Sequence, residues 1–230
     1  MQSTSATWQE IEAGEHWKEV KAVIGGVDYD MTALASMKVI GEIFGGGTPT
    51  LGLAVSRSIQ ISMLETDSSS IPRMAEIRPY VRICNNTQQS EWLPKGVFYI
   101  DTRTVGQNDS LDIEGFDKML MAECYLDMSS LVWPVIDEDL VDLIVADLNI
   151  TKSSRVSTLM DQAFQITVPA DFTEREILAN IAALYGGSFF INDNGELDLV
   201  CLWDKPPETN YLVDDQGYRL VYGSDRIILA

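Results

Sequence analysis

The chain has 230 residues, of which 46% are hydrophobic and 22% charged, proportions that are typical of globular proteins. Its 35 Asp and Glu against 16 Lys and Arg give a net charge of −19, which repels phosphate groups and argues against specific nucleic-acid binding. No run of about 18 uncharged apolar residues occurs, so no membrane span is expected. The three cysteines, Cys84, Cys124 and Cys201, are odd in number and far apart, which argues against a disulfide framework or a metal site and suits a reducing compartment.

Residues 1–16 are expected to be peripheral, with one helical turn around Trp8 and Ile11. This segment is acidic and lacks the apolar centre of a secretory signal.

Residues 17–117 carry the pattern of short antiparallel strands. Residues 17–31 alternate apolar and polar positions around Gly25-Gly26, which predicts a tight hairpin. The following stretches predict further strands at residues 36–44, 57–64, 75–84, 91–105 and 110–117, with a loop at 45–54. Pro79 suggests an edge strand or a strand start, because proline cannot donate to a ladder. The spacing predicts an antiparallel β-barrel or sandwich.

Residues 118–203 predict a small α/β domain. Residues 117–126 favour a short helix, residues 137–148 a longer one, and residues 163–169 a strand. Asp137 to Asp139 suit the first turn of the longer helix, where the helix dipole favours negative charge. Residues 204–230 read as a linker followed by the start of a second β-domain, which is expected to be incomplete where the chain ends. The predicted class is therefore mainly β with α+β character.

The best-specified segment is "TEREILANIAALYGGSFFINDNGELDLV", residues 173–200. Thr173 and Glu176 match a capping box, and an apolar stripe follows at three- and four-residue steps. Gly186 is suited to end the helix. Period-two alternation on either side of Asn194-Gly195 then predicts a β-hairpin.

Candidate chemistry in the sequence is sparse, and no catalytic, cofactor-binding or metal-binding residue is predicted. The one histidine, His16, has no nucleophile or orienting acid beside it and is interpreted as a surface residue. The loop 45–52 lacks the Lys-Ser/Thr end of a phosphate loop. Carboxylates cluster at three places, which are interpreted as residues of a helix start, of turns or of the solvent-facing side of a strand: Asp137–Asp139, the hairpin residues Asp193, Glu196 and Asp198, and Asp214-Asp215. A carboxylate hydrolase stays as a third alternative.

Aromatic residues leave a second alternative open. Trp92, Phe98, Tyr99, Trp133 and Trp203 could line a sugar-binding face, although aromatics in short strands usually fill the core.

Three motifs in chain order carry a resemblance to a known family. They are Trp92 to Asp101, "WLPKGVFYID"; Phe116 to Leu120, "FDKML"; and the helix, glycines and hairpin from Ile177 to Leu199. Together they resemble the tail-tip or baseplate hub proteins encoded by phages and prophages of Gram-positive bacteria. The resemblance covers roughly residues 17–205.

The resemblance implies a structural virion protein and no enzyme. Such hubs are generally homotrimers whose paired barrels form a pseudo-sixfold ring. The implied partners are copies of itself, the tail tube or distal tail protein, and a spike, fibre or tape-measure protein, with no cofactor. The implied location is the tail tip of the particle, after assembly in the host cytoplasm. A carbohydrate- or receptor-binding module of a phage tail is the alternative function. The negative charge adds a hypothesis that carboxylates line the ring so that DNA passes without sticking.

Overall fold

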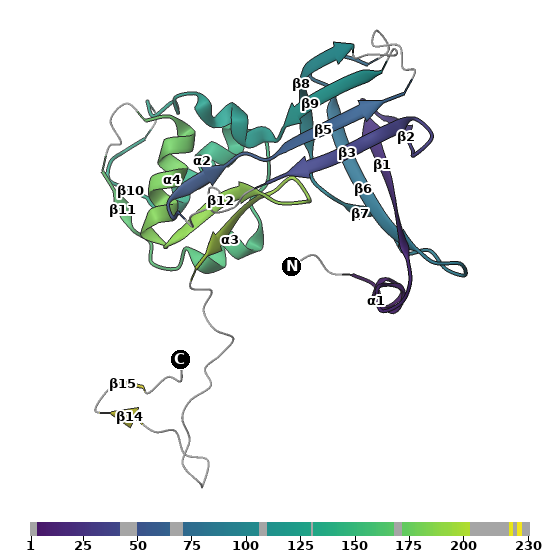
Figure 1. Cartoon of the computed structure of the whole chain (residues 1–230). Helices are drawn as coiled ribbons and strands as arrows, with labels where there is room; N and C mark the ends of the chain where they lie inside the picture. Colours follow the sequence, from purple (N-terminus) through teal and green to yellow (C-terminus); the bar gives the residue numbers. More distant parts are fainter. Residues whose placement is uncertain are drawn as a thin grey trace.

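The structure is a computed structural model that describes residues 4–41, 50–64, 71–105, 110–129, 131–167 and 172–202, with the backbone of 221–222 and 225–226. Figure 1 shows a large β-sheet on one side and a smaller layer of helices and strands on the other. The described helices are α1 (Ala6–Glu12), the 3₁₀-helix η3 (Lys118–Glu123), α2 (Asp137–Asp147), α3 (Ser154–Leu159) and α4 (Glu174–Leu184).

The large sheet contains eight antiparallel strands. Its order is β2 (Val27–Tyr29), β1 (Trp17–Ile24), β6 (Glu76–Cys84), β8 (Phe98–Val105), β9 (Leu111–Phe116), β5 (Ser58–Met63) and β3 (Leu34–Ile40), with β7 (Leu93–Pro94) paired to β6 outside this path. Every strand predicted within residues 17–117 therefore has a counterpart in the described part of the chain. The expected mainly β, α+β class is confirmed.

The sheet is open where a barrel would close. Its two end strands, β2 and β3, are consecutive in the chain and are joined by residues 30–33, yet no ladder pairs them among the described residues. Asp30 turns the chain between them, because its main-chain oxygen accepts hydrogen bonds from the N–H groups of Ala33 and Leu34. The sheet therefore curls until its ends come near each other without forming the closed barrel that was one of the two predicted forms.

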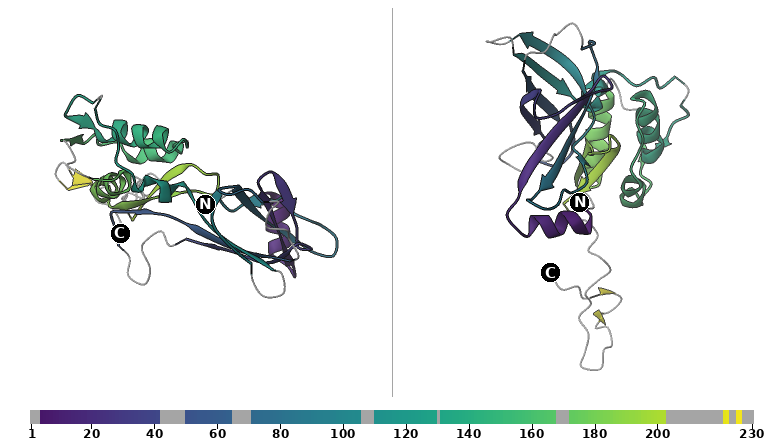
Figure 2. Two further views of the ribbon diagram at one scale, coloured as in Figure 1. Left: turned by 90° about the horizontal axis from the view of Figure 1, so that it is seen from above. Right: turned by 90° about the vertical axis from the view of Figure 1, so that its right-hand side faces the viewer.

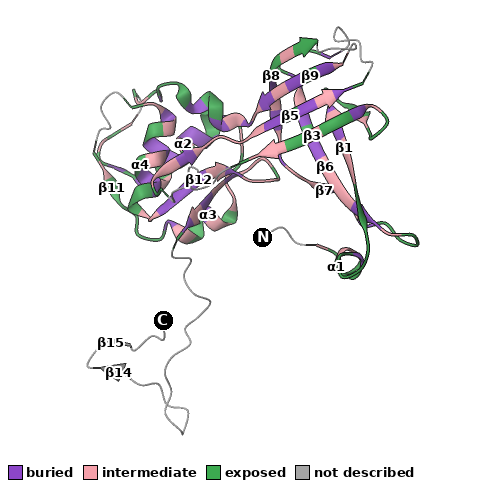
Figure 3. Cartoon of the chain, viewed as in Figure 1, coloured by how far each residue is buried: buried purple, intermediate pink, exposed green. Residues whose placement is uncertain are grey.

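The concave side of this curl holds the first core. Alternate residues of β5 and β9 are buried, and they pack with residues of β1, β6 and β8. The buried members are Ala22, Ile24, Leu34, Ile59, Ile61, Met63, Ile71, Ala75, Ile77, Phe98, Ile100, Leu111 and Ile113. Figure 3 shows these buried stretches in purple on strands of the large sheet, among them β5, β6 and β9. The period-two pattern of the sequence thus gives one buried face.

Pro79 lies inside β6, a central strand, so the prediction that it marks an edge strand or the start of a strand is wrong. It is buried and faces Ala22 of β1. On the other side, β8 pairs with β6 only as far as Ile77, and β7 begins its pairing at Tyr80. Pro79 occupies this gap and accepts a hydrogen bond from the N–H of Lys95 through its oxygen at 2.9 Å. A proline is tolerated here because no ladder hydrogen bond needs its missing N–H.

The smaller layer is built on three strands. β12 (Gly187–Ile191) pairs antiparallel with β13 (Leu197–Cys201) and parallel with β4 (Leu53–Val55). The sequence predicted a loop at 45–54, so Leu53 and Ala54 of β4 correct that prediction, while residues 45–49 lie outside the described residues. Three residues are too few to show an alternating pattern, and their partner strand is more than 130 positions away.

The helix and hairpin of residues 173–200 are confirmed. Thr173 and Glu176 form the complete capping box of α4, and Gly186 has the positive φ of 61° that a helix C-terminus requires. The turn between β12 and β13 contains Gly195 at φ 86°. The predicted helices at 117–126 and 137–148 are η3 and α2. The predicted turn around Trp8 is α1, which contacts β6. Figure 2 shows α1 as the dark purple helix at one end of the large sheet.

The second core lies between the helices and the three-stranded sheet. Its buried members are Ala54, Met119, Ala122, Leu126, Val135, Leu140, Val141, Ile144, Val145, Leu148, Val156, Met160, Ile177, Leu178, Ile181, Ala182, Phe189, Ile191, Leu197, Leu199 and Cys201. One of its helices, α3, was not predicted, because six residues with a single buried position, Val156, carry little periodicity. The strand at 163–169 is reduced in the described residues to β11 (Gln165–Ile166), paired with β10 (Val135–Ile136).

Near the C-terminus, β14 (Val221–Tyr222) pairs with β15 (Asp225–Arg226). The rest of 203–230 lies outside the described residues, and the predicted domain boundaries stay a prediction. Among the described helices, none combines the length and the apolar character that a membrane span requires.

Candidate functional site

Arg57 ties the two layers together. It lies between β4 of the small sheet and β5 of the large sheet. Its guanidinium donates hydrogen bonds to Asp193 Oδ1 at 2.8 Å, to the main-chain oxygen of Ile191 at 3.2 Å and to that of Lys95 at 3.0 Å. The first two acceptors belong to the β12–β13 hairpin and the third precedes β8. Asp193, interpreted from the sequence as a turn residue, therefore also anchors the turn to the large sheet.

Asp117 holds the start of η3 on the same junction. Its carboxylate accepts hydrogen bonds from the N–H of Arg57 at 2.8 Å, the hydroxyl of Ser56 at 2.9 Å and the N–H of Met119 at 3.1 Å. The side chain is buried, and desolvation raises the pKa of its carboxyl to about 6 in spite of these donors. Asp117 thus fastens the start of η3 to the segment Ser56–Arg57.

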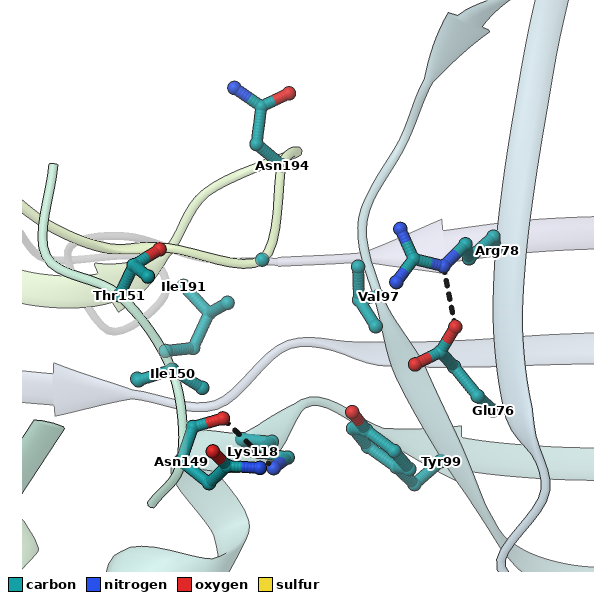
Figure 4. A pocket seen from close by; sticks show the side chains of 11 residues that line it. Glu76, Arg78, Val97, Tyr99, Lys118, Asn149, Ile150, Thr151, Ile191 and Asn194 are labelled. Atoms are coloured by element: carbon teal, nitrogen blue, oxygen red, sulfur yellow. Dashed lines mark hydrogen bonds and ion pairs between the residues drawn. The ribbon is translucent and has the colours of Figure 1, made fainter. Parts of the chain in front are cut away.

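A groove of about 340 Å³ opens beside this junction. Figure 4 shows Glu76, Arg78, Val97 and Tyr99 on the side of the large sheet, facing residues of η3, of the segment after α2 and of the hairpin turn. The remaining lining residues are Lys118, Asn149, Ile150, Thr151, Ile191, Asn194 and Gly195.

The charged side chains of the groove are already engaged. Arg78 pairs with Glu76 at 2.5 Å. Lys118 donates to the main-chain oxygens of Leu148 at 2.9 Å and Asn149 at 3.3 Å, where it satisfies the C-terminal end of α2. Among the described residues, the charged groups of the groove are thus held by partners within the protein.

A second hollow, of about 740 Å³ and more apolar, lies between residues 131–136 and α2. Val132 is 87% exposed and Ile136 41%, and Leu131, Pro134 and Leu143 complete its apolar wall. Exposed apolar side chains at a hollow are typical of surfaces that contact other proteins.

The edges of the large sheet offer a third kind of contact. Among the strands that the structure describes, β3 pairs only with β5 and β2 only with β1. Such edges present free N–H and C=O groups that can pair with another chain. Lys38 and a register shift between Leu34 and Ser36 break the regularity of β3, as is common on edges that must not aggregate.

The other candidate residues that the structure describes each have local partners or are exposed. His16 is exposed, and its Nδ1 lies 2.9 Å from the main-chain oxygen of Gly14. Asp137 is fully buried and accepts a hydrogen bond from the Tyr185 hydroxyl at 2.6 Å, a contact that the sequence did not predict. Glu138 forms an ion pair with Lys152 at 2.7 Å.

The hairpin carboxylates also have local partners. Glu196 Oε2 accepts a hydrogen bond from the amide of Asn192 at 3.1 Å, and Asp198 accepts one from the hydroxyl of Ser153 at 2.9 Å. Asp214-Asp215 and Trp203 lie outside the described residues.

The predicted aromatic residues that the structure describes have different surroundings. Phe98 is fully buried in the first core, whereas Trp133 packs against the second. The ring of Trp92 is covered by the guanidinium of Arg82 at 4.5 Å and lies 5.3 Å from the ammonium of Lys21. Tyr99 is half-buried and lines the groove beside Lys118, and the sugar-binding alternative stays a prediction.

The chain was compared with protein-family models, with curated protein sequences and with solved structures, and only the solved structures gave matches. No protein-family model matches the chain, and no curated protein sequence matches it. The fold is similar to that of the 43 kDa tail protein of prophage MuSo2 from Shewanella oneidensis, with a TM-score of 0.52 and 15% identity over 81% of this chain and 56% of that one. It is also similar to the tail protein from Neisseria meningitidis MC58, with a TM-score of 0.53 and 14% identity over 79% of this chain and 50% of that one. The chain thus spans about half the length of each.

Proposed function

We propose that this chain is a structural component of a phage-type tail. The observation that carries the proposal is the fold shared with two tail proteins over about four fifths of the chain. The three ordered motifs at Trp92 to Asp101, Phe116 to Leu120 and Ile177 to Leu199 support it independently, because they rest on the residues themselves.

Within the tail, we infer a position at the tip or baseplate hub, where the protein links the tail tube to a spike or fibre. The open edges β2 and β3 and the hollow beside α2 are the surfaces that support binding to neighbouring subunits. A homotrimer fits this role, since a hub must match the symmetry of a spike to that of a tube. The tail tube or distal tail protein and a spike, fibre or tape-measure protein are the proposed partners.

The location follows from this role. We expect a virion protein that is assembled in the bacterial cytoplasm, from a phage of the Gram-positive type. The domain division at residues 17–117 and 118–203 belongs to the same proposal. Arg57 and the parallel β4–β12 pairing would hold the two parts as one unit.

Labelling of purified particles tests the proposal. Antibody against this chain, coupled to gold, should mark one end of the tail in electron micrographs, away from the capsid. Label along the tail shaft, on the capsid, or absent from particles that infect normally would overturn the hub position. A glycan array would test the alternative receptor-binding role: binding of a host wall sugar at the tail end would favour that role over the hub.

A further inference from the structure

A cluster of three potential ligands lies where η3, α2 and α4 meet. Cys124 directly follows η3, Asp147 ends α2, and Glu174 begins α4. One ligand atom from each, the thiol sulfur and two carboxylate oxygens, lies within 4.8 Å of the other two. The N–H of Glu174 donates to the main-chain oxygen of Cys124 at 2.9 Å, which fixes these two segments against each other.

The burial of Glu174 is a second, independent observation that points to a ligand bound at this cluster. Its side chain is 0% exposed, and neither of its carboxylate oxygens has a hydrogen-bond partner among the described residues. A buried carboxylate without a partner is costly, and native proteins compensate it with a donor, a counter-charge or a metal ion.

The basic side chains on the same elements do not supply the missing charge. Lys118 donates to main-chain oxygens at the end of α2, and Arg175 donates to the oxygen of Ala54 at 2.8 Å and pairs with Glu123 at 2.5 Å. The thiol of Cys124 donates weakly to the main-chain oxygen of Met121 at 3.3 Å. The described basic side chains of these elements therefore leave the cluster without a counter-charge.

We propose that Cys124, Asp147 and Glu174 bind a divalent transition-metal cation of the zinc class. One sulfur and two oxygens suit Zn²⁺, which accepts Cys and carboxylate ligands, whereas Mg²⁺ and Ca²⁺ are bound by oxygen alone. Zn–S and Zn–O bonds of about 2.3 and 2.1 Å place tetrahedral ligand atoms roughly 3.5 Å apart. The three ligand atoms, which lie within 4.8 Å of one another, would have to approach each other on binding. The fourth position stays open to water, because Cys124 and Asp147 are exposed. The bound ion would join three helical elements and neutralise the buried carboxylate.

Metal titration tests this proposal independently of the proposed role in a phage-type tail. The full chain, freed of metal with a chelator, is titrated with Co²⁺ while the thiolate-to-cobalt charge-transfer absorption is followed, and Zn²⁺ is then added in competition. The expected result is one equivalent bound, with the absorption band displaced by Zn²⁺. Cys124→Ser should abolish the band, and Asp147→Asn should weaken binding at least about tenfold.

Matched controls separate the site from general charge and thiol effects. Cys84→Ser removes a buried thiol in β6, and Asp139→Asn removes an exposed carboxylate from the same helix as Asp147. Both should bind Co²⁺ like the wild type. Absence of binding by the wild type would overturn the proposal, as would binding that survives both Cys124→Ser and Asp147→Asn. Stabilisation by Glu174→Gln in a chain that binds no metal would identify the cluster as a protonated carboxyl pair instead.

Discussion

Arg57 and Asp193, which are 136 positions apart, form an ion pair of 2.8 Å that joins the large sheet to the hairpin of the small layer. The side chain of Arg57 is only 14% exposed and that of Asp193 30%. The guanidinium also bonds two main-chain oxygens, so its removal leaves several acceptors without a donor.

Arg57→Ala should therefore lower the free energy of unfolding by roughly 2–4 kcal/mol, the scale for removing one partner of a largely buried pair. Urea unfolding measures it. Asp28→Asn is the control: it breaks the exposed Lys21–Asp28 pair, which is 3.7 Å long, and should leave the unfolding free energy unchanged within error. Equal effects of the two substitutions would mean that Arg57 does not hold the layers together.

Asp117 should make stability depend on pH in a defined direction. Its pKa is raised from 3.8 to about 6 in the folded chain, so the folded state favours the protonated form. This contribution is fully present below about pH 4 and is lost as pH rises through about 6, by roughly 3 kcal/mol in all.

The comparison with Asp117→Asn isolates this effect from the other carboxyls. Unfolding by urea at about pH 4 and about pH 7 should show that the stability of the wild type relative to the variant is greater at the lower pH. A difference that stays constant, or that grows with pH, would contradict the raised pKa.

Gly52 is required by the position of β4. Its φ is +74°, and a Cβ there would lie 2.8 Å from the Cβ of Ala183 on α4. Gly26 has a similar φ of +87°, but a Cβ there would meet nothing within 4 Å. Gly26→Ala should cost about 1–2 kcal/mol from backbone strain alone.

Gly52→Ala should cost more than that by roughly 1 kcal/mol or above, because overpacking is added to the strain. Urea unfolding of both variants gives the difference. If the two losses are equal, α4 yields to the extra methyl group and β4 is not closely packed.

Most elements that the sequence predicted correctly were predicted from patterns of neighbouring residues. The capping box at Thr173 and Glu176 and the turn before Gly195 are written in neighbouring residues, so α4 and its hairpin could be predicted from residues 173–200 alone. The alternating strands of the large sheet are equally local. Whether the sheet closes depends on how far it curls, and no neighbouring residue encodes that.

Contacts between distant segments could not be predicted in the same way. The pairing of β4 with β12, the hydrogen bond from Tyr185 to Asp137, and the meeting of Cys124 with Asp147 and Glu174 each join residues that no spacing relates. Asp137 to Asp139 were interpreted as first-turn residues favoured by the helix dipole, and that local pattern gave no sign of the contact between Asp137 and Tyr185.

The mass of the native protein is the most direct test of the claim that these surfaces bind other subunits. Native mass spectrometry should be applied to the purified chain and to the chain co-expressed with tail-tube and spike proteins of the same phage or prophage. A hub component should form an assembly with three copies of the 25.6 kDa chain, alone or with its partners. A protein that remains a single copy at every concentration and with every partner would contradict the account.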